Sequence, residues 1–169
     1  MAISAWASAA ATAFFAAACL LAAARDVASY TIPNRIVGTL LAAYLPFSLA
    51  AGVDVATAGM SVAGAACVFV AGAAVFAKGI LGGGDVKFAS VAALWVGPSM
   101  LPWFLLLASV SGAVFALAVV ALRSFPLPAG TPVWLRKRVA ETDERGIPYG
   151  VALAFGALAV LPHAHWATG

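Results

Sequence analysis

The sequence has 169 residues, of which 64% are hydrophobic and 9% are charged, and its formal net charge is +3. Soluble domains carry roughly 25% charged residues, and a soluble domain of this size could not bury so much apolar surface. The composition therefore excludes a soluble globular protein and predicts a membrane protein. Because the basic residues stand between apolar runs, they indicate membrane topology, and the positive charge gives no reason to expect nucleic-acid binding.

Six apolar runs approach the length that a helix needs to cross a bilayer, about 20 residues for a hydrocarbon core of roughly 30 Å. The first run begins at Met1 with no basic segment before it. We therefore expect a retained helix there rather than a cleaved signal peptide. In chain order, the predicted helices cover residues 3–24, 36–51, 56–77, 86–97, 101–122 and 147–161.

The fourth and fifth predicted helices divide one apolar stretch, residues 86–122, which is too long for a single crossing. Gly97-Pro98 and Pro102 predict a turn within it, since proline lacks an N–H donor and the residue before it avoids helical angles. A single crossing would also place Arg123 and the basic residues after it outside the cell, against the usual charge bias. Both arguments favour two helices.

All nine lysines and arginines fall in three connecting segments, residues 25–35, 78–87 and 123–145. The positive-inside rule places these segments in the cytoplasm, which puts both termini in the periplasm. We predict an all-α polytopic membrane helix bundle with about six transmembrane helices. Residues 1–169 form one domain, and residues 123–146 form a cytoplasmic loop. This loop is either a solvated connector near anionic headgroups or a docking surface for a partner.

The cysteines and histidines do not have the spacing of a metal site. Cys19 and Cys67 both lie inside apolar runs with no further ligand nearby in sequence, so we expect small core residues rather than ligands or a disulfide. His163 and His165 follow Pro162 near the end of the chain, where we expect a surface tail. No metal or cofactor site is predicted.

Two aspartates, Asp26 and Asp85, stand at the predicted cytoplasmic edge of the membrane. Each has a purely structural explanation. Asp26 could pair with Arg25, and Asp85 could stabilise a helix N-terminus through the macrodipole. The three consecutive glycines before Asp85 favour a functional site, because residues without Cβ allow unusual backbone angles and the close approach of another chain.

The predicted topology brings these aspartates to one side, because Asp26 ends the first helix and Asp85 begins the fourth. Two carboxylates that share a site cannot both ionise easily, so the pair retains one proton and titrates jointly. In aspartic proteolysis the ionised partner takes a proton from water while the protonated partner polarises the scissile carbonyl. Such a pair needs no metal and no nucleophilic side chain.

The segment Gly82-Gly83-Gly84-Asp85-Val86-Lys87 resembles the GxGD motif of the type IV prepilin peptidases, polytopic aspartic proteases in which a Lys often follows the Asp by two residues. Asp26 followed by Ile32-Pro33-Asn34 is similar to the first-aspartate region of that family. Ile147-Pro148-Tyr149-Gly150 resembles the start of its last span. The resemblance therefore covers nearly the whole chain.

This resemblance implies removal of the short basic leader from prepilins at the cytoplasmic face of the bacterial inner membrane. Asp26 and Asp85 would be the catalytic residues, Gly82 and Gly84 would shape the loop, and Lys87 and Asn34 would support it. The implied partners are the prepilin, the lipid bilayer and the pilus assembly machinery. No cofactor is implied.

The segment between the first two predicted helices indicates a subtype. Many family members carry a large cytoplasmic insertion with paired cysteines there and also methylate the new amino terminus. Here about ten residues without cysteine fill that position. The chain thus resembles the short, peptidase-only form associated with Flp or Tad pili.

Two alternatives remain open at this stage. A GxGD protease of the presenilin and signal-peptide-peptidase class would share the GxGD loop alone. A small transporter or a non-catalytic assembly subunit would use the aspartates to bind cations or to hold helices together, although a transporter is expected to place polar groups near the membrane midplane. Loss of either carboxylate would then weaken transport or folding rather than abolish a cleavage.

Overall fold

The computed structural model describes residues 2–124, 130–133 and 148–166, with side chains described for residues 5–121 of the first range. The loop predicted at residues 123–146 lies mostly outside the described residues, as does Ile147. The described residues form helices α1 (Ala2–Ser29), α2 (Asn34–Ala51), α3 (Val55–Ala77), α4 (Gly83–Ser124) and α6 (Tyr149–Val160), and the 3-10 helix η1 (Leu161–His163). The described part contains no strand, so the all-α prediction is confirmed.

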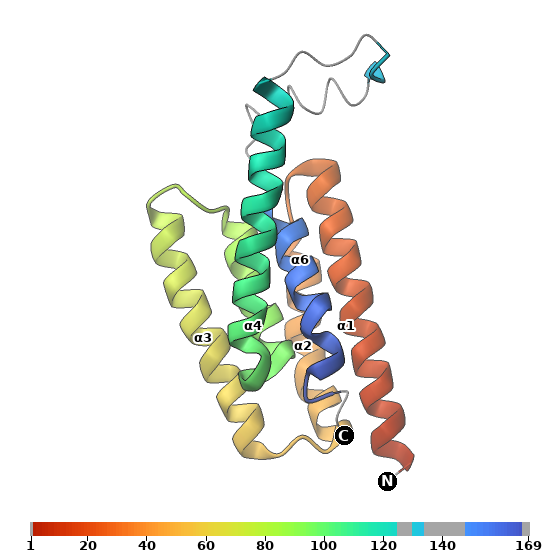
Figure 1. Cartoon of the computed structure of the whole chain (residues 1–169). Coiled ribbons are helices and arrows are strands. Elements are labelled where there is room, and N and C mark those ends of the chain that lie inside the picture. Colours follow the sequence, from red (N-terminus) through yellow and green to blue (C-terminus); the bar gives the residue numbers. More distant parts are fainter. Residues whose placement is uncertain (1, 125–129, 134–147, 167–169) are drawn as a thin grey trace.

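Three of these helices are long and apolar enough to cross a membrane, over Ala5–Ser29, Val55–Ala77 and Gly83–Ala121, within the described residues. Their length and hydropathy make the chain an integral membrane protein. The number of six crossings and the periplasmic position of both termini stay predictions. Figure 1 shows that the start of α1 and the 3-10 helix η1 lie at the same end of the bundle.

Helix α4 contains the predicted turn between the fourth and fifth helices. Gly97 has φ 77° and ψ 172°, a non-helical conformation, and Pro98 follows it. A positive φ favours glycine because a Cβ would clash with the backbone. The chain reverses direction there, and the second half of α4 runs back past the other helices (Figure 1).

Small residues allow the helices to pack closely, which suits association in lipid. Helix α4 packs most extensively against α6 and α3. A Cβ on Gly64 would lie 2.9 Å from Leu101, and a Cβ on Gly156 would lie 2.8 Å from the backbone nitrogen of Ala108. Gly72, Gly112 and Gly150 are equally crowded, whereas Gly59 and Gly79 have no neighbour within 4 Å. Gly59 and Gly79 therefore take no part in close packing against the described residues.

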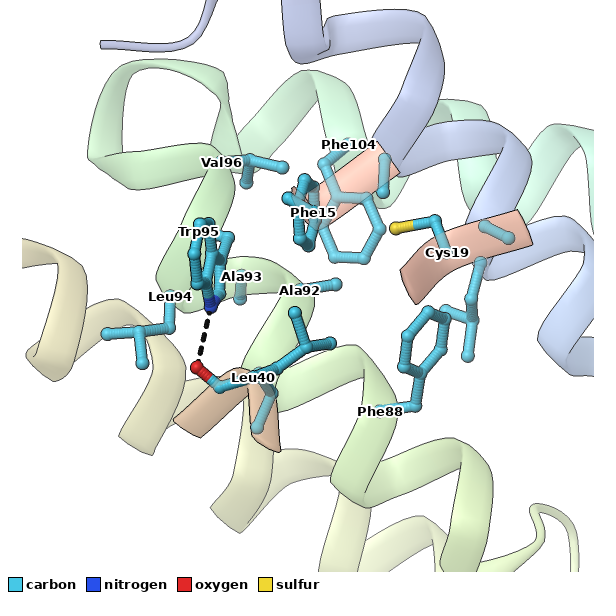
Figure 2. Close-up of a cluster of buried hydrophobic side chains, with 14 of the residues drawn as sticks. Phe15, Cys19, Leu40, Phe88, Ala92, Ala93, Leu94, Trp95, Val96 and Phe104 are labelled. Carbon is cyan, nitrogen blue, oxygen red and sulfur yellow. Dashed lines mark hydrogen bonds between the residues drawn. The ribbon is translucent and has the colours of Figure 1, made fainter. Parts of the chain in front are cut away.

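The core of the bundle surrounds Trp95 of α4. Its ring stacks on Phe15 of α1 with a centroid distance of 5.3 Å, and its Nε1 donates a hydrogen bond to the carbonyl oxygen of Leu40 in α2 at 3.0 Å (Figure 2). Trp166 donates from its own Nε1 to the carbonyl oxygen of Trp95 at 2.6 Å. Trp95 therefore joins three segments that are distant in sequence.

Two predictions need correction, one about the cysteines and one about the C-terminal histidines. Cys67 is exposed on α3, although Cys19 is buried as expected. The segment after η1 is not a surface tail, because Trp166 is buried and the ring nitrogens of His165 are buried without a hydrogen-bond partner. Burial lowers the pKa of His165, which favours the neutral ring in this apolar contact.

Candidate active site

The C-terminal end of α1 and the start of α4 lie at the end of the bundle opposite the start of α1 (Figure 1). Asp26 stands in the last turn of α1, and Asp85 stands in the first turn of α4. The expected meeting of helix one and helix four at a common end is therefore found in the fold. Helix α1 continues for about one turn past Asp26 instead of ending there.

Asp26 is buried, with 3% of its surface exposed, and it faces the interior of the bundle. Its neighbour Arg25 is exposed, which argues against a pairing of Asp26 with Arg25. Instead, Oδ2 of Asp26 accepts a hydrogen bond from the backbone N–H of Gly150 at 2.7 Å. The backbone N–H of Val151 also hydrogen-bonds the Asp26 carboxylate. These donors belong to the first turn of α6, whose N–H groups have no partner within their own helix.

The turn after α1 brings Ile32 back beside Asp26. Tyr30 ends the helix with a left-handed φ of 54°, and its N–H donates to the carbonyl oxygen of Asp26 at 2.8 Å. The chain then passes between two glycines. A Cβ on Gly84 would lie 3.5 Å from the backbone nitrogen of Ile32. A Cβ on Gly150 would lie 2.8 Å from Cδ1 of the same Ile32.

Asp85 is half-buried, and it belongs to the first turn of helix α4. Gly82 precedes α4, and its carbonyl oxygen accepts the first helical hydrogen bond from Val86 at 3.1 Å. The backbone N–H of Gly82 hydrogen-bonds the Asp85 carboxylate, which is the reciprocal contact of a capping box. A Cβ on Gly82 would stand 2.8 Å from Oδ2 of Asp85, so a side chain there would displace the carboxylate.

Of the three glycines before Asp85, Gly82 is closely approached, whereas a Cβ on Gly83 or Gly84 would make ordinary contacts at 3.4 Å and 3.5 Å. Among the described residues, the glycines with positive φ are Gly52, Gly79 and Gly97. The backbone of Ile32 lies beside Gly84, and the Asp85 carboxylate lies beside Gly82. The expectation of unusual backbone angles is wrong, because none of residues 82–84 has a positive φ, and the close approach of another chain stays a prediction.

The two carboxylates lie close enough for the charge of Asp26 to act on Asp85. A continuous set of contacts joins them, from Asp26 to Gly150, from Gly150 to Ile32, and from Ile32 to Gly84 beside Asp85. Backbone N–H groups at the starts of α6 and α4 reach the two carboxylates. Helix N-termini favour negative charge, so the site can hold carboxylates at the edge of an apolar bundle.

Lys87 and Asn34 form a second connection between the same two regions. Nζ of Lys87 donates a hydrogen bond to Oδ1 of Asn34 at 3.2 Å, on the exposed side of the site. Lys87 follows Asp85 by two residues, and Asn34 begins α2 directly after the Ile32 turn. The predicted supporting residues therefore contact each other.

Sequence reasoning did not assign a role at the site to Gly150 or Ile32. The contact of Gly150 with Asp26 joins residues 124 positions apart. The signal available in the sequence was the segment Pro148-Tyr149-Gly150, which opens an apolar helix after a polar loop. Among the described residues, no group of three or more His, Cys, Asp or Glu side chains could hold a metal ion.

Comparison with known protein families adds an independent finding. The family model described as the type IV leader peptidase family matches residues 13–117, more than half of the chain. The matched range contains Asp26, Asn34 and the segment 82–87, and it ends before α6. No curated protein and no solved structure gives a significant match.

Proposed function

The chain belongs to the type IV leader peptidase family, aspartic-type prepilin leader peptidases of the inner membrane, and from this premise we propose its substrate and its catalytic pair. We infer that it removes the N-terminal leader from a Flp-type prepilin at the cytoplasmic face. Asp26 and Asp85 activate the attacking water. Membership of this family favours an enzyme over the transporter and assembly-subunit alternatives.

The assignment of the catalytic pair is supported by the convergence of Asp26 and Asp85 at one end of the bundle. There the charge of one carboxylate acts on the other. One ionised carboxylate takes a proton from water, and the water oxygen forms a bond to the scissile carbonyl carbon. The protonated carboxyl group gives its proton to the carbonyl oxygen. Collapse of the tetrahedral intermediate breaks the C–N bond, and the leaving amine takes up a proton.

The surroundings of the pair support a peptide substrate. Gly82 is exposed and has no side chain, so an extended peptide can approach the main chain beside Asp85 from the exposed side. The basic segments 25–35 and 78–87 flank the site, and by the positive-inside rule they favour a cytoplasmic position for it. A leader located on that side would reach Asp85 without crossing the membrane.

The substrate class is tested by co-expression with a Flp-type prepilin in a host that lacks its own leader peptidase. We expect mass spectrometry to show loss of the leader and a new amino terminus without the mass of a methyl group, because the cysteine-containing insertion is missing between α1 and α2. A prepilin from another type IV pilus class serves as the comparison. Cleavage of that prepilin alone would refute the Flp assignment, and a methylated product would refute the peptidase-only form.

The hydrogen bond between Lys87 and Asn34 leads to a prediction about coupling. Lys87→Met and Asn34→Ala are each expected to slow leader removal about threefold to tenfold, because each releases the start of α4 from the Ile32 turn. The double variant should be no slower than the slower single variant, since both changes remove the same exposed hydrogen bond, worth about 1 kcal/mol. Initial cleavage rates at matched membrane levels measure this. Fully multiplicative effects would show that the two residues act separately.

A further inference from the structure

The first turn of α6 holds one oxygen of Asp26 in a fixed place. The hydrogen bond from Gly150 N–H to Oδ2 is 2.7 Å long and buried, and Asp26 itself is almost inaccessible. A short bond from a backbone group of a helix has little freedom to move. The orientation of the Asp26 carboxylate therefore depends on the position of the backbone at Gly150.

Gly150 approaches Asp26 more closely than another residue could. An added Cβ would lie 2.8 Å from Oδ2 and 3.0 Å from Cγ of Asp26, and 2.8 Å from Cδ1 of Ile32. Ordinary van der Waals contacts with a Cβ begin at about 3.4 Å. Any side chain at position 150 must therefore displace the carboxylate, Ile32 or the start of α6.

We propose that Gly150 is a positioning residue for Asp26 in leader cleavage, an inference that rests on the function proposed above. The amide of Gly150 holds Oδ2 and so fixes the plane in which the Asp26 carboxylate lies. Catalytic groups must be held within hydrogen-bond reach of the proton that they transfer, and a misplacement of about 1 Å can reduce a rate by about 10²-fold. The lack of a Cβ at residue 150 is therefore a requirement of the reaction.

A purely structural role for this contact makes a different prediction. If Asp26 served to cap α6, a change at Gly150 would lower stability and leave the turnover of the folded enzyme unchanged. Gly156 provides the matched comparison on the same helix. Its added Cβ would be equally crowded, at 2.9 Å from the Ala108 Cβ and 2.9 Å from the Phe104 carbonyl oxygen, but its neighbours are not carboxylates.

The test compares Gly150→Ala with Gly156→Ala in cleavage of a prepilin by the full-length enzyme in membranes. We expect Gly150→Ala to lower kcat by about tenfold or more while KM changes less than about threefold, since orientation of the catalytic group is lost rather than substrate binding. The double change Gly150→Ala with Ile32→Val should remain slow, because it relieves the contact with Cδ1 alone. A kcat within twofold of wild type for Gly150→Ala, or full recovery with Ile32→Val, would overturn the proposal.

A stability measurement keeps the proposal testable if Gly150→Ala folds poorly. We expect the loss of thermal stability from Gly150→Ala to be clearly smaller when Asp26 is first replaced by alanine, because the clash with the carboxylate is gone and only the contact with Cδ1 of Ile32 remains. An equal loss in both backgrounds would show that the carboxylate is not the group displaced, which would overturn the proposal. This comparison does not use prepilin, so it is separate from a failure of wild-type cleavage, which would refute the proposed function instead.

Discussion

Asp26→Asn and Asp85→Asn are each expected to abolish leader removal, with a cleavage rate at least about 10³-fold below that of the wild type. Each change removes a carboxyl group that must exchange a proton with water or with the scissile carbonyl. Neither amide can replace it, because the asparagine side chain does not ionise near neutral pH. The pair acts as a unit, so the double variant should be no less active than either single variant.

Asparagine is the informative replacement because both carboxylates also accept backbone hydrogen bonds. The carbonyl oxygen of Asn can still accept from Gly150 N–H at position 26 and from Gly82 N–H at position 85. Alanine would remove these contacts together with the charge, and a loss of activity could then reflect a loss of folding. With asparagine, the variants should insert and accumulate as the wild type does.

Asp54 supplies the matched control for this experiment. It precedes α3, and its Oδ1 accepts a hydrogen bond from Thr57 N–H at 2.9 Å. The connection between α2 and α3 lies at the end of the bundle opposite the C-terminal end of α1 (Figure 1). Asp54→Asn keeps a good helix cap and should leave leader cleavage unchanged. The measurement is the mass shift of the prepilin at matched membrane levels. Normal cleavage by Asp26→Asn or by Asp85→Asn would show that the catalytic pair is assigned wrongly.

The helices and the turn at Gly97 were predictable because their signals are local. Apolar runs between charges determine where helices stand in a membrane protein, and a Gly-Pro pair cannot continue a regular helix. The predicted helix at residues 56–77 differs by one residue from α3, Val55–Ala77. The positions of Asp26 and Asp85 at one end follow from the same reasoning, since two further crossings separate them in the prediction.

The contact between Gly150 and Asp26 was not predictable because it depends on tertiary packing. No local pattern indicates that the first turn of α6 would donate to a residue of α1. The outward position of Cys67 has a related cause. Helix α3 is apolar on all sides and has one buried residue, Ser61. When the surrounding solvent is lipid, hydropathy does not separate the packed face of a helix from the exposed face.

Trp95→Ala should have the opposite effect to the aspartate changes, a large loss of stability with little change in turnover. Trp95 is fully buried, and its ring contacts Phe14, Phe15, Tyr44, Phe47 and Trp166. Removal leaves a cavity between α1, α2 and the C-terminal segment. We expect a cost of about 3 kcal/mol, near the lower end for Trp→Ala in soluble cores, because the exposed surface enters lipid rather than water.

The active site should tolerate this change because Trp95 lies ten residues after Asp85 on α4, about 15 Å along the helix axis. Denaturation in detergent should show the loss of stability, while kcat per folded enzyme should stay within about twofold of the wild type. Trp103→Ala is the matched control, since Trp103 is on the same helix and 58% exposed, and it should cost less than about 0.5 kcal/mol. Equal destabilisation by both changes would mean that the aromatic cluster around Trp95 does not hold the bundle together.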